Sequence, residues 1–164
     1  MKRNLFLSLA IFLALGSSVG AGPASKIEVG KEVTLAYQLF VNGKLLETAD
    51  AKNPFTYLHG QHQIVPGLEK NLTGLRTGDK KTIRVLPKEG YGLVNPKAFR
   101  EIGKDKLPPG VPLEKGTPLE ARDPNGIPML VKIAEVKEKT VVIDFNHPLA
   151  GKELEFQIEV LGIK

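Results

Sequence analysis

Hydrophobic and polar residues alternate along several stretches of this chain. In residues 33–41 the apolar side chains occupy every second position, which is typical of a strand with one buried face. Asn42-Gly43 follows at once, and this dipeptide favours a tight hairpin turn into residues 44–47. The last stretch, residues 153–163, alternates in the same way. The pattern therefore predicts a β-rich fold that begins with a hairpin.

One short helix is predicted between these strands. Pro66 suits the first helical position, Leu68 and Leu72 lie four residues apart on one side, and Gly74 stands near the end. A further strand is expected at residues 80–86. Together the elements indicate an α+β fold, mainly β, in which one antiparallel sheet wraps around one short helix.

The pattern changes in the middle of the chain, where seven of the twelve prolines lie between residues 96 and 128. The elements expected there are a short helix at residues 97–102, capped by Asn95-Pro96, and three strands at 117–122, 127–136 and 140–145. The strands before and after this region still need each other to complete a sheet. We therefore expect an inserted module at residues 96–141 within a discontinuous domain formed by residues 27–95 and 142–164.

Residues 1–21 have the pattern of a secretory signal peptide. Lys2 and Arg3 give a basic start, residues 5–15 are apolar, and small residues lead to Ala21. The apolar run is shorter than the about 20 residues that a membrane span needs. We expect cleavage after Ala21 and an exported, periplasmic protein without stable membrane association. A retained anchor is the alternative.

Composition narrows the possible chemistry. The chain of 164 residues has no cysteine and three histidines, and none of its serines lies beyond Ser25. A thiolate nucleophile, a disulfide and a serine nucleophile in the body of the protein are therefore excluded. The formal net charge is +5, but basic and acidic residues are interspersed, which argues against nucleic acid as a partner.

Polar motifs in the chain indicate neither a metal site nor a cofactor. His59 and His62 lie three residues apart, but Gly60 between them predicts a loop, and no acidic ligand stands at a suitable spacing. We expect turn histidines that hydrogen-bond to the backbone. Glu47 and Asp50 are close in sequence, as capping or solvated carboxylates often are. No glycine-rich phosphate loop is present.

A set of motifs spread over residues 28–163 carries a resemblance to a known family. The motifs are Leu35-Ala36-Tyr37-Gln38, Tyr57-Leu58-His59-Gly60, IVPGLEKNL at 64–72, Gly78-Asp79-Lys80, Glu89-Gly90-Tyr91-Gly92 and DFNHPLAGKELEF at 144–156. They resemble the FKBP-type peptidyl-prolyl isomerases, and the last one resembles their SlyD-like branch. The resemblance implies an FKBP-like twisted antiparallel sheet around a short helix, with a small β-rich insert-in-flap domain that acts as a chaperone.

The resemblance also implies a substrate pocket. Its residues are Tyr37, Glu47, Phe55, Ile64, Val65, Leu68, Tyr91, Leu149 and Phe156. In this comparison the Tyr91 hydroxyl and a backbone N–H near Val65 meet substrate carbonyls, and Leu68 forms the floor. Glu47 stands where the family usually has aspartate, so its part in the pocket stays open between a pocket hydrogen bond and capping.

The implied activity is prolyl isomerisation in unfolded exported polypeptides, combined with holdase activity of the insert. The alternative is mainly an unfolded-protein-binding chaperone with weak isomerase activity. The apolar loop from Leu107 to Leu113 is the expected contact surface of the insert. Rotation about an X–Pro bond breaks no covalent bond, so the reaction suits a chain without an activated nucleophile, metal or cofactor. A monomer is expected.

Overall fold

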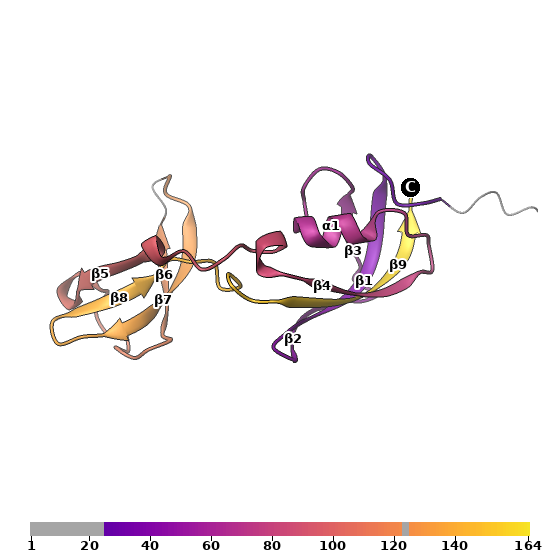
Figure 1. The fold of residues 1–164 in the computed structure, drawn as a ribbon. Helices are drawn as coiled ribbons and strands as arrows, with labels where there is room; N and C mark the ends of the chain where they lie inside the picture. The colour runs from indigo at the N-terminus through magenta and orange to yellow at the C-terminus, as the bar shows by residue number, and fades with distance from the viewer. Residues whose placement is uncertain (1–24, 123–124) are drawn as a thin grey trace, which may run out of the picture.

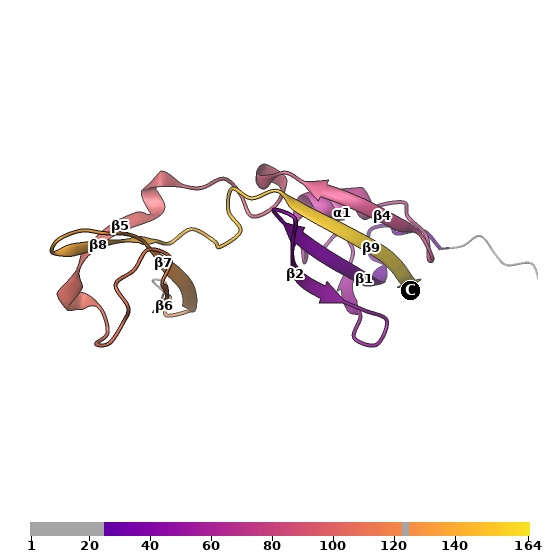
Figure 2. The ribbon, with the colours of Figure 1, turned by 90° about the horizontal axis from the view of Figure 1, so that it is seen from below.

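The computed structural model describes residues 25–122 and 125–164, and the predicted signal segment at residues 1–21 lies outside this range. The described chain forms two antiparallel sheets at opposite ends of an elongated molecule (Figures 1 and 2). The first sheet and its helix comprise β1 (Glu32–Val41), β2 (Lys44–Ala49), β3 (Phe55–Leu58), α1 (Pro66–Leu72), β4 (Lys80–Val85) and β9 (Leu154–Ile163). The second sheet comprises β5 (Phe99–Gly103), β6 (Pro118–Arg122), β7 (Pro128–Val136) and β8 (Thr140–Asp144). Short 3-10 helices are formed by Pro87–Glu89, Pro96–Ala98 and Lys104–Lys106.

Strand β1 is central to the first sheet, whose order is β2-β1-β9-β4, with β3 also paired to β1. The predicted hairpin is confirmed, because Asn42 and Gly43 both have positive φ angles, 51° and 74°. Two such residues form the turn whose twist matches that of the flanking strands. The predicted helix is confirmed as well, beginning at Pro66 and followed by Gly74 with a φ of 85°.

One face of the first sheet packs on α1. Because side chains alternate along a strand, Leu35 and Leu39 of β1 are buried on the same face. Leu68 and Leu72 of the helix meet this face in a single cluster. The buried members of the cluster are Ile27, Val33, Leu35, Leu39, Tyr57, Leu68, Leu72, Ile83, Val85, Leu154, Phe156, Ile158 and Val160. A mainly β fold with one buried helix is therefore confirmed.

Strands β4 and β9 are neighbours in space although the second sheet separates them in sequence. Val85 near the end of β4 pairs with Leu154 at the start of β9. Between these residues the chain leaves the first sheet, builds the second and returns (Figure 1). The two connecting segments, residues 90–95 and 145–153, form a neck between the sheets. Hydrogen bonds join the two passes of the neck. Gly151 N donates to Gly92 O at 2.8 Å, and Asn95 N donates to Asn146 Oδ1 at 2.8 Å.

The second sheet has the order β5-β8-β7-β6 and differs from the prediction in its first element. The predicted helix at residues 97–102 is wrong. The Asn95 side chain does cap the turn that Pro96 opens, accepting the N–H of Lys97 at 3.0 Å. Only one 3-10 turn forms, because residues 99–103 pair along β8 and this pairing overrides the local helix signal.

The second sheet also reaches beyond residue 141, the expected end of the insert, because β8 continues to Asp144. Its buried core consists of Val131, Ile133, Val141 and Ile143. Leu107 and Val111, which the sequence suggested as part of a contact surface, are half-buried against this core. Leu113 remains exposed.

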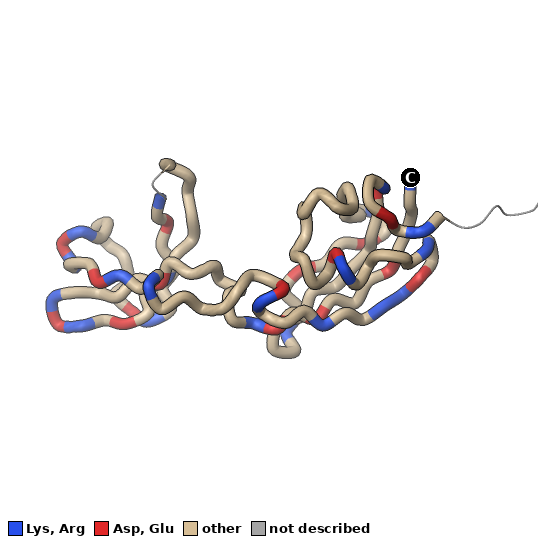
Figure 3. Tube along the Cα trace, turned by 45° about the horizontal axis from the view of Figure 1, so that its top comes forward, with Lys and Arg blue, Asp and Glu red and all other residues tan. Residues whose placement is uncertain are grey.

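Charged residues of both signs are interspersed along both halves of the described chain (Figure 3). Several are paired across strands, such as Arg84 with Glu155 and Lys80 with Glu159, both at 3.1 Å. In residues 25–122 and 125–164, no helix has the length and apolar character required to cross a membrane.

Candidate active site

A small pocket opens between the first sheet and α1. Its volume is about 200 Å³. The lining residues are Tyr37, Leu39, Glu47, Phe55, Gln63, Ile64, Val65, Leu68, Tyr91 and Phe156. Eight of the nine site residues expected from the sequence therefore come together. They arrive from β1, β2, β3, α1, β9 and the segments before α1 and after β4.

Aromatic rings form one side of this pocket. Tyr37 contacts Phe55 edge to face, with ring centroids 5.9 Å apart, and contacts Phe156 at 6.1 Å. Phe55 in turn stacks on the buried ring of Tyr57 at 6.0 Å. Offset and edge-to-face pairs of this kind fix ring positions. The wall is therefore aromatic, and its rings pack on one another.

Glu47 belongs to the pocket rather than to a capping site. The Tyr37 hydroxyl donates to Glu47 Oε1 at 2.7 Å. Burial, together with this hydrogen bond and the charge of Glu47, raises the pKa of Tyr37 above its ordinary value. Tyr37 therefore stays protonated and remains a hydrogen-bond donor over the whole physiological range.

The start of α1 provides the floor of the pocket and a backbone hydrogen-bond donor. Leu68 is buried at the floor. Val65 precedes the helix, and its carbonyl accepts the N–H groups of Leu68 and Glu69. Within residues 25–122 and 125–164, no acceptor takes the N–H of Val65 itself. This N–H is a donor at the pocket that a substrate carbonyl can use.

Tyr91 stands at the rim, where it is 40% exposed. Its ring stacks in parallel on His147, with centroids 4.1 Å apart and planes 1° apart. His147 Nδ1 accepts the N–H of Leu149 at 3.1 Å, so the imidazole is itself held by the backbone. Burial lowers the pKa of His147, which favours the neutral ring that this hydrogen bond requires.

Leu149 is not among the residues that line the pocket; it is half-buried against the first core. Two lining residues were missed in the sequence. Leu39 follows Tyr37 by two positions on β1, so its inward side was predictable from the alternation. Gln63 carried no such signal, and its side-chain oxygen accepts the N–H of Leu58 at 2.9 Å.

The prediction that His59 hydrogen-bonds to the backbone through its ring is wrong. The ring is buried, with Nδ1 2.9 Å from the Tyr57 hydroxyl and Nε2 3.0 Å from Thr73 Oγ1. His62 is exposed and lies 3.4 Å from Glu69 Oε2. In the described ranges, no group of three or more histidine, cysteine or acidic side chains is placed to hold a metal ion.

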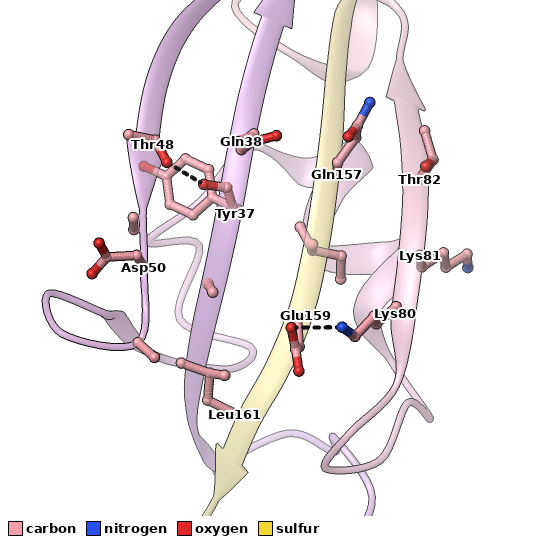
Figure 4. A pocket seen from close by; sticks show the side chains of 14 residues that line it. Tyr37, Gln38, Thr48, Asp50, Lys80, Lys81, Thr82, Gln157, Glu159 and Leu161 are labelled. Carbon is pink, nitrogen blue, oxygen red and sulfur yellow. Dashed lines mark hydrogen bonds and ion pairs between the residues drawn. The ribbon is translucent and has the colours of Figure 1, made fainter.

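A larger hollow of about 690 Å³ lies on the other face of the sheet, across β2, β1, β9 and β4 (Figure 4). Its side chains include the ion pair of Lys80 with Glu159, and Thr48 donates there to the carbonyl of Tyr37 at 3.2 Å. Gln38 and Gln157 extend from the middle strands. This is the solvated polar face of a half-buried sheet, so the smaller apolar pocket is the better candidate.

Comparisons with known proteins agree with this geometry. A family model of the FKBP-type peptidyl-prolyl cis-trans isomerases matches residues 24–161. The chain is 39% identical over 140 residues to the FKBP-type peptidyl-prolyl cis-trans isomerase SlyD of Haemophilus influenzae, covering 85% of this chain and 73% of that protein. It is 39% identical over 140 residues to SlyD of Pasteurella multocida, covering 85% and 70%. It is 31% identical over 153 residues to a short-type peptidyl-prolyl cis-trans isomerase of Methanocaldococcus jannaschii, covering 84% and 94%.

The family match includes every residue of the pocket and both sheets, except the last two residues of β9. Two of the relatives cited are SlyD proteins, so the likeness extends to the SlyD-like branch. The chain belongs to the FKBP-type peptidyl-prolyl cis-trans isomerase family, and it is an enzyme of that type.

Proposed function

We propose that the pocket formed by Tyr37, Val65, Leu68 and Tyr91 accelerates X–Pro isomerisation in unfolded exported polypeptides. The observation that carries this assignment is an apolar pocket of about 200 Å³ with an unused backbone donor, the N–H of Val65. Its volume suits a proline ring with part of the preceding residue. Among the described residues that line the pocket, Glu47 alone carries a charge, and it is hydrogen-bonded to Tyr37.

The chemistry asked of the pocket is to lower a rotational barrier. Resonance holds the peptide bond planar, with a barrier of about 18–20 kcal/mol, and water stabilises the planar form through the carbonyl oxygen. The apolar wall removes this water, and Leu68 supports the proline ring. The less polar twisted amide is then favoured over the planar ground state. The Val65 N–H and the Tyr91 hydroxyl orient the neighbouring carbonyls.

We further propose that the second sheet is an insert-in-flap domain that holds unfolded chains near this pocket. Supporting this, the insert exposes large apolar side chains. Leu130 is 58% exposed, and Phe99 and Leu113 are also accessible. Exposed apolar residues on a small sheet and its loop suit contact with unfolded polypeptides, which display apolar segments themselves.

Export rests on the amino-terminal sequence. Its basic start, apolar run and small residues before Gly22 support secretion with cleavage after Ala21. Expression in a bacterium, followed by mass determination of periplasmic protein, tests this proposal. A mature amino terminus at Gly22 supports export, and intact protein that stays with the membrane fraction supports the anchor.

Mainly chaperone function with weak isomerase activity is the second candidate, favoured by the exposed apolar surface of the insert. Two variants separate the candidates. Tyr91→Ala should lower turnover in a protease-coupled proline-peptide assay at least about tenfold and leave suppression of aggregation intact. Replacing residues 96–145 by a short turn should lower suppression of aggregation and keep peptide turnover.

Glu159→Gln serves as the control, because Glu159 lies on the opposite face of the sheet, paired with Lys80. If both variants lose both activities equally, the two-site proposal fails. If wild-type turnover is negligible while suppression is strong, the second candidate is correct.

A further inference from the structure

The loop between β3 and α1 builds one wall of the pocket with Gln63, Ile64 and Val65. Within this loop two residues adopt the left-handed region, Gly60 with a φ of 87° and His62 with a φ of 53°. A residue other than glycine rarely adopts that conformation and persists there only when surrounding contacts hold it. The shape of the wall therefore depends on the intramolecular contacts that hold the loop in this conformation.

Glu69 makes contacts that hold the middle of this loop. Its Oε1 accepts the backbone N–H of Gly60 at 2.8 Å, and its Oε2 lies 3.4 Å from His62 Nδ1. The side chain is only 11% exposed. A carboxylate that is buried to this extent requires hydrogen-bond partners. The N–H of Gly60 is such a partner, and the His62 ring lies beside the other oxygen, so both neighbours belong to the loop.

The position of Glu69 links the loop to the pocket floor. Glu69 lies in the first turn of α1, next to Leu68, which forms the floor. The loop is anchored at its start, because His59 N donates at 2.9 Å to the carbonyl of Lys31, the residue before β1, and it ends where α1 begins. Between these two attachments, the Glu69 carboxylate accepts a hydrogen bond from Gly60 and lies beside His62, the two left-handed residues of the loop.

We propose that Glu69 is a positioning residue for isomerisation: its carboxylate sets the wall residues Ile64 and Val65, and the free N–H of Val65, against Leu68. The inference rests on the proposed function of the pocket. Glu69 does not line the pocket, so it acts through the loop. A displacement of about 1 Å at a substrate-orienting group can cost up to about 10²-fold in rate.

Three substitutions at Glu69 separate the effect of side-chain length from the effect of its charge. Glu69→Gln keeps an oxygen at the same distance from the backbone and removes the charge. Glu69→Asp keeps the charge and shortens the side chain by one methylene, and Glu69→Ala removes both. Since the hydrogen bond to Gly60 needs reach rather than charge, we expect Gln to retain kcat/KM within about twofold. Asp and Ala should lower kcat/KM about tenfold.

Two further measurements report on the loop itself. Amide hydrogen exchange of Gly60 should speed up in the Asp and Ala variants and stay slow in the Gln variant. The amide resonance of Val65 should shift in the same two variants. Glu159→Gln, which removes a carboxylate from the opposite face, should change none of these quantities.

Unchanged kcat/KM in folded Asp and Ala variants would overturn the inference, provided that Tyr91→Ala still lowers turnover. A Gln variant as slow as the Ala variant would overturn it too, because charge rather than reach would then matter. If Glu69→Ala does not fold, the Asp and Gln variants decide between these outcomes. If Tyr91→Ala leaves turnover unchanged, the pocket assignment itself fails and this inference fails with it.

Discussion

The two sheets of the molecule bury apolar side chains to very different extents. The core of the first sheet contains thirteen described buried apolar side chains, two of them from α1 and seven from β1 and β9. The second sheet has four buried apolar side chains, those of Val131, Ile133, Val141 and Ile143, and within residues 25–122 and 125–164 no α-helix covers it. Buried apolar area is the main source of stability. The sheet that carries the pocket therefore has a much larger reserve of stability.

This difference matches what each half is proposed to do. A pocket that must hold a proline ring against Leu68 needs walls that do not move, and a large interlocked core supplies them. A surface that contacts many unfolded chains benefits from adaptable side chains, and the thin sheet exposes Phe99 and Leu130. Low local stability of the second sheet would then favour its proposed contact with varied unfolded chains.

Hydrogen exchange should show the largest contrast. We expect the amides of Val141 and Ile143 to exchange about a thousandfold faster than those of Leu35 and Ile158, because the smaller sheet opens without unfolding the larger one. Native-state exchange followed by NMR measures this ratio. Equal protection in both sheets would show that they unfold as one unit and do not differ in local stability.

Truncating a buried side chain in each core tests whether the halves are energetically separate. Ile133→Ala should destabilise the second sheet by about 2–4 kcal/mol, since Ile133 is fully buried. Peptide turnover should stay within about twofold of wild type. Leu72→Ala, the matched change beneath the first sheet, should instead lower the main thermal transition and turnover together. Calorimetry and the peptide assay distinguish the two results.

Acidification should weaken the second sheet first. Asp144 is buried, and burial alone would raise its pKa, but hydrogen bonds from Asn146 and the ammonium group of Lys132 lower it below the ordinary value. Its stabilising contribution is therefore complete above the unfolded-state pKa of about 4, and it is lost as the pH falls through the lower folded-state pKa.

The matching variant is Asp144→Asn. It should cost about 1–3 kcal/mol at neutral pH, because a buried, charge-assisted set of hydrogen bonds is weakened. It should also flatten the pH dependence below about pH 4. Urea unfolding at several pH values measures both effects. If the free energy of unfolding of the variant falls with decreasing pH as steeply as that of the wild type, other carboxylates cause the acid sensitivity.

Glu47 is expected to give the smallest effect. Glu47→Ala removes the partner of the Tyr37 hydroxyl and should slow peptide turnover about threefold, in line with one hydrogen bond at an exposed site. Glu47→Gln preserves an acceptor and should stay near the wild-type rate. If the alanine variant turns over peptide at the full rate, the Tyr37–Glu47 contact does not contribute to catalysis.

Strong local patterns made much of the first sheet predictable. The alternation of β1, the Asn42-Gly43 turn and the proline at the start of α1 each depend on neighbouring residues only, and each is confirmed. The pocket residues were located through resemblance. Alternation alone identified them as buried positions without distinguishing a pocket from a core.

The failures all involve contacts that the local sequence pattern does not indicate. Residues 97–102 carry a local helix start, but pairing with β8, some forty residues later, makes most of them a strand. His59 gave no sign that its ring would meet Thr73 at the end of α1, fourteen residues later. Gln63 enters the pocket because its oxygen binds Leu58 N, a contact that depends on the loop shape. Such contacts follow from tertiary structure.

The hydrogen-bonded neck has a consequence for how the chain closes on itself. Asn95 and Asn146 are hydrogen-bonded to each other, so the two ends of the insert are held together. For the first sheet, the insert is therefore equivalent to a loop that is already closed. Loop-closure entropy grows only slowly with length, by about 0.6 kcal/mol for each doubling. A segment of any size could therefore be exchanged between these two asparagines at little thermodynamic cost, which makes the neck a natural grafting point for foreign binding domains.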